Sequence, residues 1–261
     1  MEITTHNEEK DEIWWKEIEK RIDCVYRKII KNKGKKLKVL DLGCGDGVNI
    51  FRLNEINSQA EYIGIDFDKE KIEYANKIVK KHNLKNMGFI HKDVVKEEIK
   101  IKNFDLIISS EVFEHFYDGE KIKIMNNISK ILKLNGHLLI TTPTPNSFFR
   151  LAYESHCWPI RKLVNFVFNN NYIDRILNDF KYTRYHHVGV CDKKYYQKLA
   201  YRKGFVLIKT WPSAVFQSKE FRPITKKIMN FIFIKINPFA EQFSSSIIYL
   251  YKKKKEDIIE F

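Results

Sequence analysis

The stretch that decides the fold is Val39-Leu40-Asp41-Leu42-Gly43-Cys44-Gly45-Asp46-Gly47, in which an apolar strand pattern runs directly into three glycines at alternate positions. Glycine lets the backbone approach a ligand without a Cβ in the way, and a helix that starts after such a turn offers free N–H groups. Dinucleotide-binding turns have the spacing G-x-G-x-x-G, which leaves room for a pyrophosphate. Here the third glycine comes one position earlier, and Asp41 precedes the first glycine by two positions. This tighter, acidic turn predicts a nucleotide-like cofactor without phosphates.

Strand and helix patterns alternate along the rest of the chain. Short apolar runs predict strands, and apolar residues three or four apart predict the helices that connect them. The predicted strands after the turn are residues 62–66, 88–91, 104–111, a fifth strand that ends near residue 140, 205–210 and 246–251. The predicted helices are residues 8–31, 69–82, 119–132 and 193–202. This order predicts an α/β fold with crossover helices between parallel strands.

These motifs together resemble the class I S-adenosylmethionine (SAM)-dependent methyltransferases, whose first motif is the same acidic G-x-G-x-G turn. The resemblance covers residues 37–143 strongly and residues 186–210 more weakly. Its specificity comes from the order and spacing of the motifs, because each one alone also describes many NAD-binding domains. The resemblance implies a Rossmann-like, seven-stranded, mostly parallel sheet with helices on both faces. It also implies a last strand inserted antiparallel beside the fifth, and a lid inserted after strand five.

The resemblance also implies which residues bind SAM. Asp66 ends the second strand, where the family's acidic residue accepts hydrogen bonds from both ribose hydroxyls. Asp93, after the third strand, matches the carboxylate near the adenine amine. The full set of cofactor-binding residues that the resemblance implies is Asp41, Gly43, Gly45, Asp66, Phe67, Asp93, Val94 and Glu111.

The E-x-x-E-H pattern after the fourth strand is a second chemical motif. If a helix begins near Glu111, then Glu111, Glu114 and His115 lie on one face at i, i+3 and i+4. Two carboxylates and an imidazole on such a face suit a divalent metal such as Mg²⁺ or Mn²⁺, with His186 or His187 as a further ligand. The pattern resembles quinone-biosynthesis O-methyltransferases and small-RNA 3′-end 2′-O-methyltransferases. The alternative is that Glu114 and His115 only shape the turn after strand four.

Methyl transfer needs alignment of the acceptor and, for a hydroxyl acceptor, a base. A histidine titrates near neutral pH and suits that role. His115 is the first candidate because it lies beside the cofactor motifs, and His187 is the second because the segment after it resembles the family's His-helix-Gly-Phe order. The Asn-Pro-Pro-Tyr motif of many N-methyltransferases does not occur after strand four. O-methylation is therefore favoured, and a carbon acceptor stays open.

The chain divides into an N-terminal amphipathic helix, residues 1–36, and a methyltransferase domain, residues 37–261. Residues 144–185 are longer than a bare connection requires and are rich in aromatic and basic residues. Because they follow the carboxyl end of a strand, where α/β folds place ligands, we expect a substrate lid there. An additional packed helical pair is the alternative.

Composition narrows the class of protein. The chain has 261 residues, 44% of them hydrophobic, and no apolar run long enough to span a bilayer. Residues 1–11 are acidic and polar, unlike a signal peptide. Its four cysteines are scattered, which indicates neither a disulfide framework nor a zinc site. We therefore expect a cytoplasmic protein, with a peripheral contact at the membrane surface as an open alternative.

The net charge of +14 is uneven along the chain. Residues 1–143 contain 26 Lys and Arg against 24 Asp and Glu, whereas residues 144–261 contain 21 against 9. The basic half predicts an anionic or amphiphilic partner, or else an ordinary solvated surface. A hydrophobic run at residues 228–234, flanked by lysines, adds an expectation of weak contact with anionic lipid.

The sequence leaves three classes of function open. The first is an O-methyltransferase acting on a small-molecule or lipid-like acceptor, which the aromatic lid and basic half favour. The second is an RNA 2′-O-methyltransferase that uses a metal held by the E-x-x-E-H motif, although no RNA-recognition signature is present. The third is a SAM-binding protein without catalysis, which the intact acidic and glycine residues disfavour. The acceptor and the oligomeric state do not follow from the sequence.

Overall fold

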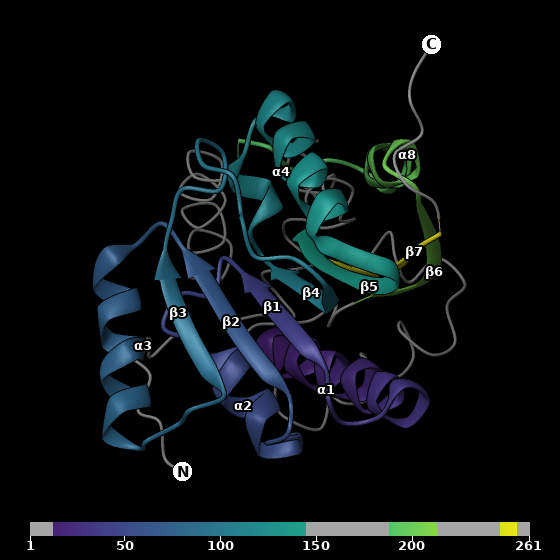
Figure 1. The fold of residues 1–261 in the computed structure, drawn as a ribbon. Coiled ribbons are helices and arrows are strands. Elements are labelled where there is room, and N and C mark those ends of the chain that lie inside the picture. The colour runs from purple at the N-terminus through teal and green to yellow at the C-terminus, as the bar shows by residue number, and fades with distance from the viewer. Residues whose placement is uncertain (1–12, 145–187, 213–245, 255–261) are drawn as a thin grey trace, which may run out of the picture.

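The computed structural model describes residues 13–144, 188–212 and 246–254 (Figure 1). The glycine turn and the E-x-x-E-H motif both lie within these ranges. Most of the predicted lid and both His186 and His187 lie outside the described residues, as does the hydrophobic run at residues 228–234.

Seven strands and five α-helices form the described fold. The strands are β1 Lys38–Leu42, β2 Glu61–Asp66, β3 Met87–His91, β4 Phe104–Ser110, β5 Leu132–Pro143, β6 Phe205–Pro212 and β7 Ser246–Lys253. The helices are α1 Ile13–Lys33, α2 Val48–Ile56, α3 Lys69–Lys81, α4 Asp118–Ile131 and α8 Lys193–Arg202, with a short 3₁₀ helix, η2, at Phe113–His115. The helices predicted at 69–82, 119–132 and 193–202 match α3, α4 and α8 to within one residue.

The strands form one sheet in the order β3-β2-β1-β4-β5-β7-β6. The strands β1 to β5 pair in parallel, whereas β7 pairs antiparallel with both β5 and β6. The expected seven-stranded, mostly parallel sheet and the antiparallel last strand are confirmed. Because the strand order reverses between β1 and β4, a crevice forms at the carboxyl ends of those two strands, where open α/β sheets bind ligands.

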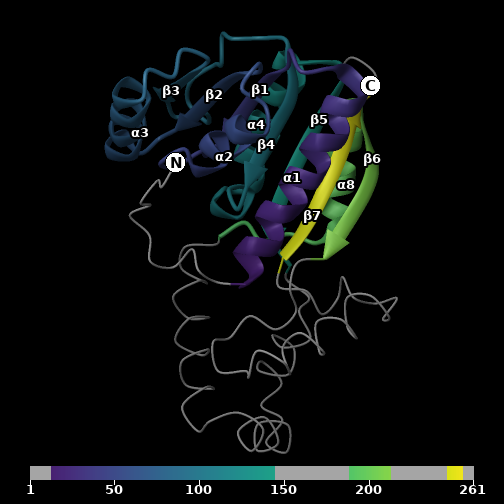
Figure 2. The same ribbon diagram turned by 90° about the horizontal axis from the view of Figure 1, so that it is seen from below.

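Alternate residues of the strands face two separate cores. In β1, Val39 belongs to the core under α1, α2 and α3, and Leu40 belongs to the core under α4 and α8. Both residues are fully buried, as expected for a parallel strand covered on both faces. Figure 2 shows α1 lying along the sheet beside β5 and β7. The sheet is therefore the middle of three layers. Because helices cover both of its faces, a ligand can approach it at the ends of the strands.

No regular helix begins near Glu111, so the condition for a shared face of Glu111, Glu114 and His115 is not met. Glu111 has a φ of 53°, in the left-handed region that side chains rarely adopt, and only η2 follows before α4 begins at Asp118. The left-handed backbone at Glu111 turns the chain away from the sheet, so β4 ends at Ser110. The E-x-x-E-H motif therefore lies on a tight turn and not on a regular helix.

Candidate active site

The glycine turn connects β1 to α2 at the switch point of the sheet. Gly43, Gly45 and Gly47 all have positive φ, at 76°, 55° and 85°. The amides of Gly43 and Cys44 both donate to the carbonyl of Ile65 in β2, at 2.8 and 3.1 Å. The turn is thus folded back onto β2, and its left-handed backbone explains why glycine stands at the alternate positions.

The three glycines differ in what surrounds them. A Cβ on Gly43 would lie 2.4 Å from Val112 Cγ2, and one on Gly47 would lie 2.5 Å from the ring of Phe89. A Cβ on Gly45 would meet nothing nearer than Lys71 Cδ at 3.9 Å. Gly43 and Gly47 are therefore required for packing, whereas Gly45 faces open space that a ligand can approach.

Asp66 joins the end of β2 to this turn. Its Oδ2 accepts the amide of Gly45 at 2.8 Å, and its Oδ1 accepts the amide of Asp68 at 2.9 Å. The side chain is largely buried, whereas Phe67 next to it is 75% exposed. Each carboxylate oxygen keeps a second lone pair. The predicted role of Asp66 toward the ribose hydroxyls is compatible with these bonds, and Asp66 also holds the turn in place, which the sequence did not indicate.

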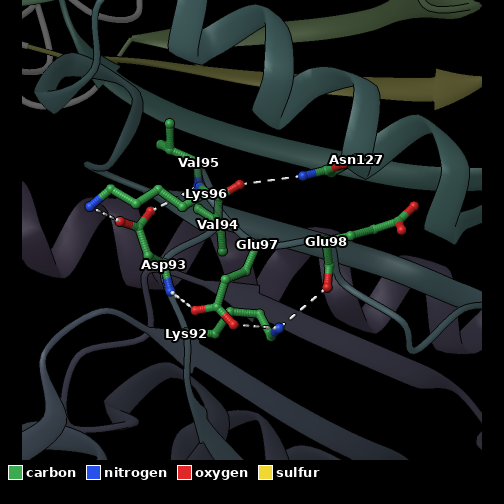
Figure 3. A network of polar contacts seen from close by, with 8 residues as sticks. All are labelled: Lys92, Asp93, Val94, Val95, Lys96, Glu97, Glu98 and Asn127. Atoms are coloured by element: carbon green, nitrogen blue, oxygen red, sulfur yellow. Dashed lines mark hydrogen bonds and ion pairs between the residues drawn. The ribbon is translucent and has the colours of Figure 1, made fainter.

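Asp93 lies in the loop after β3 (Figure 3). Its Oδ1 accepts the amides of Val95 and Lys96 at 3.0 and 3.3 Å, and its Oδ2 pairs with Lys96 Nζ at 2.9 Å. The hydrogen bond and charge of Lys96 hold the pKa of the Asp93 carboxyl below its usual value. Val94 is buried in the core beneath this loop. The contact of Asp93 with adenine stays a prediction, and it requires the exposed Lys96 side chain to share or leave the carboxylate.

Glu111 connects the ends of three strands. Its amide donates to the carbonyl of Thr141 in β5 at 3.0 Å, and its Oε1 accepts the Thr141 hydroxyl at 2.9 Å. Ser110 Oγ lies 2.9 Å from the same hydroxyl, and Ser246 Oγ in β7 donates to Glu111 Oε2 at 3.4 Å. Thr141 and Ser246 were not predicted from the sequence. Both residues lie at strand ends on the ligand-binding edge of the sheet, and this position could have identified them as candidates.

Glu114 and His115 point to different environments. The Glu114 side chain has no exposed surface, whereas His115 is exposed. Neither carboxyl oxygen of Glu114 makes a hydrogen bond of normal geometry to the part of the chain that the structure describes, although Glu111 and Thr142 are near enough to affect its pKa. Within the described residues, no three His, Cys, Asp or Glu side chains come close enough to hold a metal ion. The expected shared face of Glu111, Glu114 and His115 does not form, because the turn replaces the helix on which it depended.

The two glutamates form a buried acidic pair. Burial raises the pKa of Glu111 to about 7, against hydrogen bonds from Thr141 and Ser246 that lower it. Burial and the neighbouring charge of Glu111 raise the pKa of Glu114 well above its usual value. Burial thus disfavours charge on both carboxyls, and the raising effect on the pKa is stronger for the fully enclosed Glu114. A pKa near the operating pH at a strand end is typical of functional sites.

A cavity of about 730 Å³ opens beside the glycine turn, within the range of roughly 300–1,000 Å³ that is usual for small-molecule sites. Its lining includes Gly43, Gly45 and Glu111 from the predicted set. The other predicted cofactor residues, Asp41, Asp66, Phe67, Asp93 and Val94, are not part of its lining, and Asp41 is buried within β1. The remaining lining residues are Cys44, Asp46, Val48, Asn49, Asp68, Glu70, Lys71, Glu73, Tyr74, Lys77 and Ser110. The side chains of α3 in this wall were not predicted.

The charge of this cavity is acidic. Five carboxylate side chains line it against the two lysines Lys71 and Lys77. Such a wall favours a cationic ligand and disfavours a pyrophosphate. SAM carries a sulfonium and an ammonium group, so the charge of the lining and the open face of Gly45 both fit it.

Comparison with known proteins agrees with this geometry. A family model described as "Methyltransferase domain" matches residues 33–204. The chain is 34% identical over 109 residues to the ubiquinone biosynthesis O-methyltransferase of Pelagibacter ubique, covering 41% of this chain and 42% of that protein. It is 31% identical over 116 residues to the malonyl-[acyl-carrier protein] O-methyltransferase of Halalkalibacterium halodurans, and the match covers 43% of this chain and 41% of that protein. The chain thus spans about two fifths of the length of the curated relatives it matches.

A solved structure with the same fold is the O-methyltransferase of a polyketide synthase from Brevibacillus brevis, in complex with S-adenosyl-L-homocysteine. The TM-score is 0.56 at 17% identity, covering 90% of this chain and 73% of that one. At this identity the likeness concerns the fold. The family match extends from before β1 to the end of α8 and includes the glycine turn and β1 to β5. The chain belongs to the methyltransferase-domain family of class I SAM-dependent methyltransferases.

Proposed function

We propose that the chain transfers the methyl group of SAM to a small-molecule or lipid-like acceptor, at a hydroxyl oxygen. The observation that carries the proposal is the acidic cavity onto which Gly45 opens, between the ends of β1, β4 and the first turns of α3. Bound there, SAM would supply an electrophilic methyl group on a positively charged sulfur. We propose that Gly43, Gly45, Asp66 and Glu111 hold it, with Asp41, Phe67, Asp93 and Val94 completing the site.

The protein then has to align the acceptor and remove its proton. His115 is the proposed base because it is exposed on η2, four residues after the Glu111 that lines the cavity. His187 is the second candidate. Two residues later the amide of Gly189 donates to the carbonyl of Glu114 at 2.8 Å, which keeps the chain just after His187 close to η2. Both candidates would act at the same edge of the sheet.

The acceptor class rests on several supports. The relative from Pelagibacter ubique is named as a ubiquinone biosynthesis O-methyltransferase, and the relative from Halalkalibacterium halodurans as a malonyl-[acyl-carrier protein] O-methyltransferase. Residues 144–185, proposed as the substrate lid of the domain at 37–261, combine aromatic and basic side chains. Such a composition suits an acceptor with an apolar body and an anionic or polar end. A cytoplasmic enzyme that reaches such acceptors at a membrane surface is consistent with these supports.

The RNA methyltransferase remains the second class. It depends on a metal held by Glu111, Glu114, His115 and a further histidine, and no observation among the described residues favours that arrangement. Chelation separates the two proposals, because the RNA enzyme depends on Mg²⁺ or Mn²⁺, whereas the proposed transfer to a small-molecule acceptor assigns no role to a metal.

The direct test is methyl transfer by the purified chain. SAM labelled in its methyl group would be incubated with quinol, fatty acyl and single-stranded RNA acceptors, with and without EDTA. We expect label in an amphiphilic hydroxyl acceptor and full activity in EDTA. Label only in RNA, lost on chelation and restored by Mn²⁺, would replace this proposal with the second class.

A further inference from the structure

The outer surface of α1 is the second charged region of the described fold. The helix buries one stripe of side chains, Ile18, Ile22, Val25, Tyr26 and Ile29, under the sheet. The opposite stripe exposes Lys20, Arg27, Lys28 and Lys31, at spacings of one or two helical turns. We call these four residues the basic face of α1. Because the apolar stripe is already used in the core, the basic face is the part of α1 left for a partner.

A shallow hollow on the basic face has more cationic than anionic side chains in its lining. It is lined by Lys20, Asp23, Cys24, Arg27, Lys28 and Lys31, so four cationic side chains meet one carboxylate. That carboxylate, Asp23, is bound to Arg52 of α2 at 2.5 Å. Lys35 and Lys36, just beyond the helix, are exposed and extend the positive charge. The hollow therefore suits an anionic group.

A tryptophan lies beside this helix with cations around it. Arg21 of α1 lies 5.2 Å from the ring centroid of Trp211 at the end of β6, and Lys209 lies 5.5 Å from it. Trp211 is partly buried and packs against the core under α1. Tryptophan is enriched at membrane–water interfaces, where one part of the ring is in an apolar environment and the other is wet.

The choice between lipid and nucleic acid follows from the hollow. Proteins that bind single-stranded RNA combine positive charge with exposed aromatic rings on which bases stack. Among the side chains that the structure describes, none of those that line the hollow is aromatic. A row of cations without a stacking surface matches a sheet of lipid phosphates, to which exposed Lys and Arg add attraction one by one.

We propose that the basic face of α1 docks the protein onto anionic phospholipid bilayers as a peripheral, electrostatic contact. No helix among the described residues is long and apolar enough to cross a membrane. The apolar stripe of α1 stays in the protein core, so the contact does not require insertion. This inference does not rest on methyl transfer, because adsorption is measured without SAM or acceptor.

The test is co-sedimentation of the full chain with vesicles of phosphatidylcholine, with and without phosphatidylglycerol, at low and high salt. The test variant carries Arg27→Glu, Lys28→Glu and Lys31→Glu. Its control carries Lys85→Glu, Lys100→Glu and Lys102→Glu, the same change of charge at exposed lysines on the connections that flank β3. A milder variant with Gln at positions 27, 28 and 31 guards against misfolding, and circular dichroism checks all variants.

We expect the wild type and the control to bind acidic vesicles at low salt and to dissociate at high salt. The α1 variants should lose the binding to acidic vesicles by about tenfold or more. Equal loss in the control and in the α1 variants would overturn the proposal, since net charge alone would explain it. So would absence of wild-type binding to acidic vesicles, or binding of single-stranded RNA through the same three residues with no vesicle binding.

Discussion

The Asp66 carboxylate at the end of β2 accepts the amide of Gly45 at a distance of 2.8 Å. One side chain thus fixes the glycine turn and also lies where the family's ribose contact is expected. Asp66→Ala removes both functions. Charge-assisted hydrogen bonds contribute about 1.5–3 kcal/mol each, so we expect SAM affinity to fall by roughly two orders of magnitude or more.

The control for Asp66 is Asp105→Ala. Asp105 is also a buried carboxylate, and it accepts the amide of Lys38 and the Nζ of Lys133 at the opposite edge of the sheet. This variant should lower the thermal unfolding temperature while leaving SAM affinity in the folded protein unchanged. Equal SAM affinity of Asp66→Ala and wild type would remove Asp66 from the site.

Gly45 and Gly47 should respond differently to alanine. A Cβ on Gly45 enters the open cavity, so Gly45→Ala should weaken SAM binding strongly at a stability cost of about 1 kcal/mol for its left-handed backbone. A Cβ on Gly47 would lie 2.5 Å from the Phe89 ring, so Gly47→Ala should destabilise the protein by more. Thermal unfolding and calorimetric titration measure the two effects. The assignment of Gly45 to the cofactor fails if its alanine variant binds SAM normally.

Glu111 should make SAM binding depend on pH. Its pKa is raised to about 7 by burial, so its carboxylate is mostly neutral below that pH and charged above it. A cationic sulfonium in the cavity is attracted to the charged form. SAM affinity should therefore rise several-fold between pH 6 and pH 8. S-adenosylhomocysteine, whose sulfur is neutral, serves as the matched ligand and should show a smaller rise.

Glu111→Gln should remove that pH dependence while retaining an oxygen for the Thr141 or Ser246 hydroxyl. Calorimetry across the same pH range is the measurement. An unchanged slope in the variant would assign the titration to another group.

His137 should set part of the pH dependence of stability. It lies in β5 opposite Lys252, and its Nδ1 has no hydrogen-bond partner among the described residues. Burial, with Lys33 and Lys252 nearby, lowers the pKa of His137 from 6.5 to about 4. The unfolded chain therefore binds more protons between these pH values, and the free energy of unfolding should fall as the pH drops from about 6.5 to about 4.

His137→Gln isolates this contribution. The difference in unfolding free energy between wild type and variant, measured by denaturant titration, should change across that pH window and be constant above it. A difference that stays constant from pH 4 to pH 7 would contradict the assignment.

The sheet and its helices could be predicted because local patterns dominate there. The apolar strand of β1 is buried on both faces, and α3 has a capping Asp68 whose side chain accepts the amide of Lys71. The turn at Glu111 could not be predicted, because its left-handed backbone is held by contacts with Thr141 and Ser246, which come 30 and 135 residues later in the chain. Long-range contacts of this kind leave no local signal in the sequence.

The place of the glycine turn in the fold could be predicted for the same reason. The positions of Gly43, Gly45 and Asp66 follow from one strand–turn–helix unit and its neighbouring strand. The acidic wall of α3 follows only from how α3 packs beside the turn, which brings Glu70, Glu73 and Tyr74 into the cavity. The raised pKa values of Glu111 and Glu114 depend on burial, which the spacing of residues in the sequence does not indicate.

The central claim is that the glycine turn and its acidic cavity bind SAM. Isothermal titration calorimetry of the purified chain with SAM, S-adenosylhomocysteine and NAD tests it most directly. We expect saturable heats with SAM and with S-adenosylhomocysteine, and none with NAD. Clear binding of NAD together with no heat from either SAM or S-adenosylhomocysteine would contradict it.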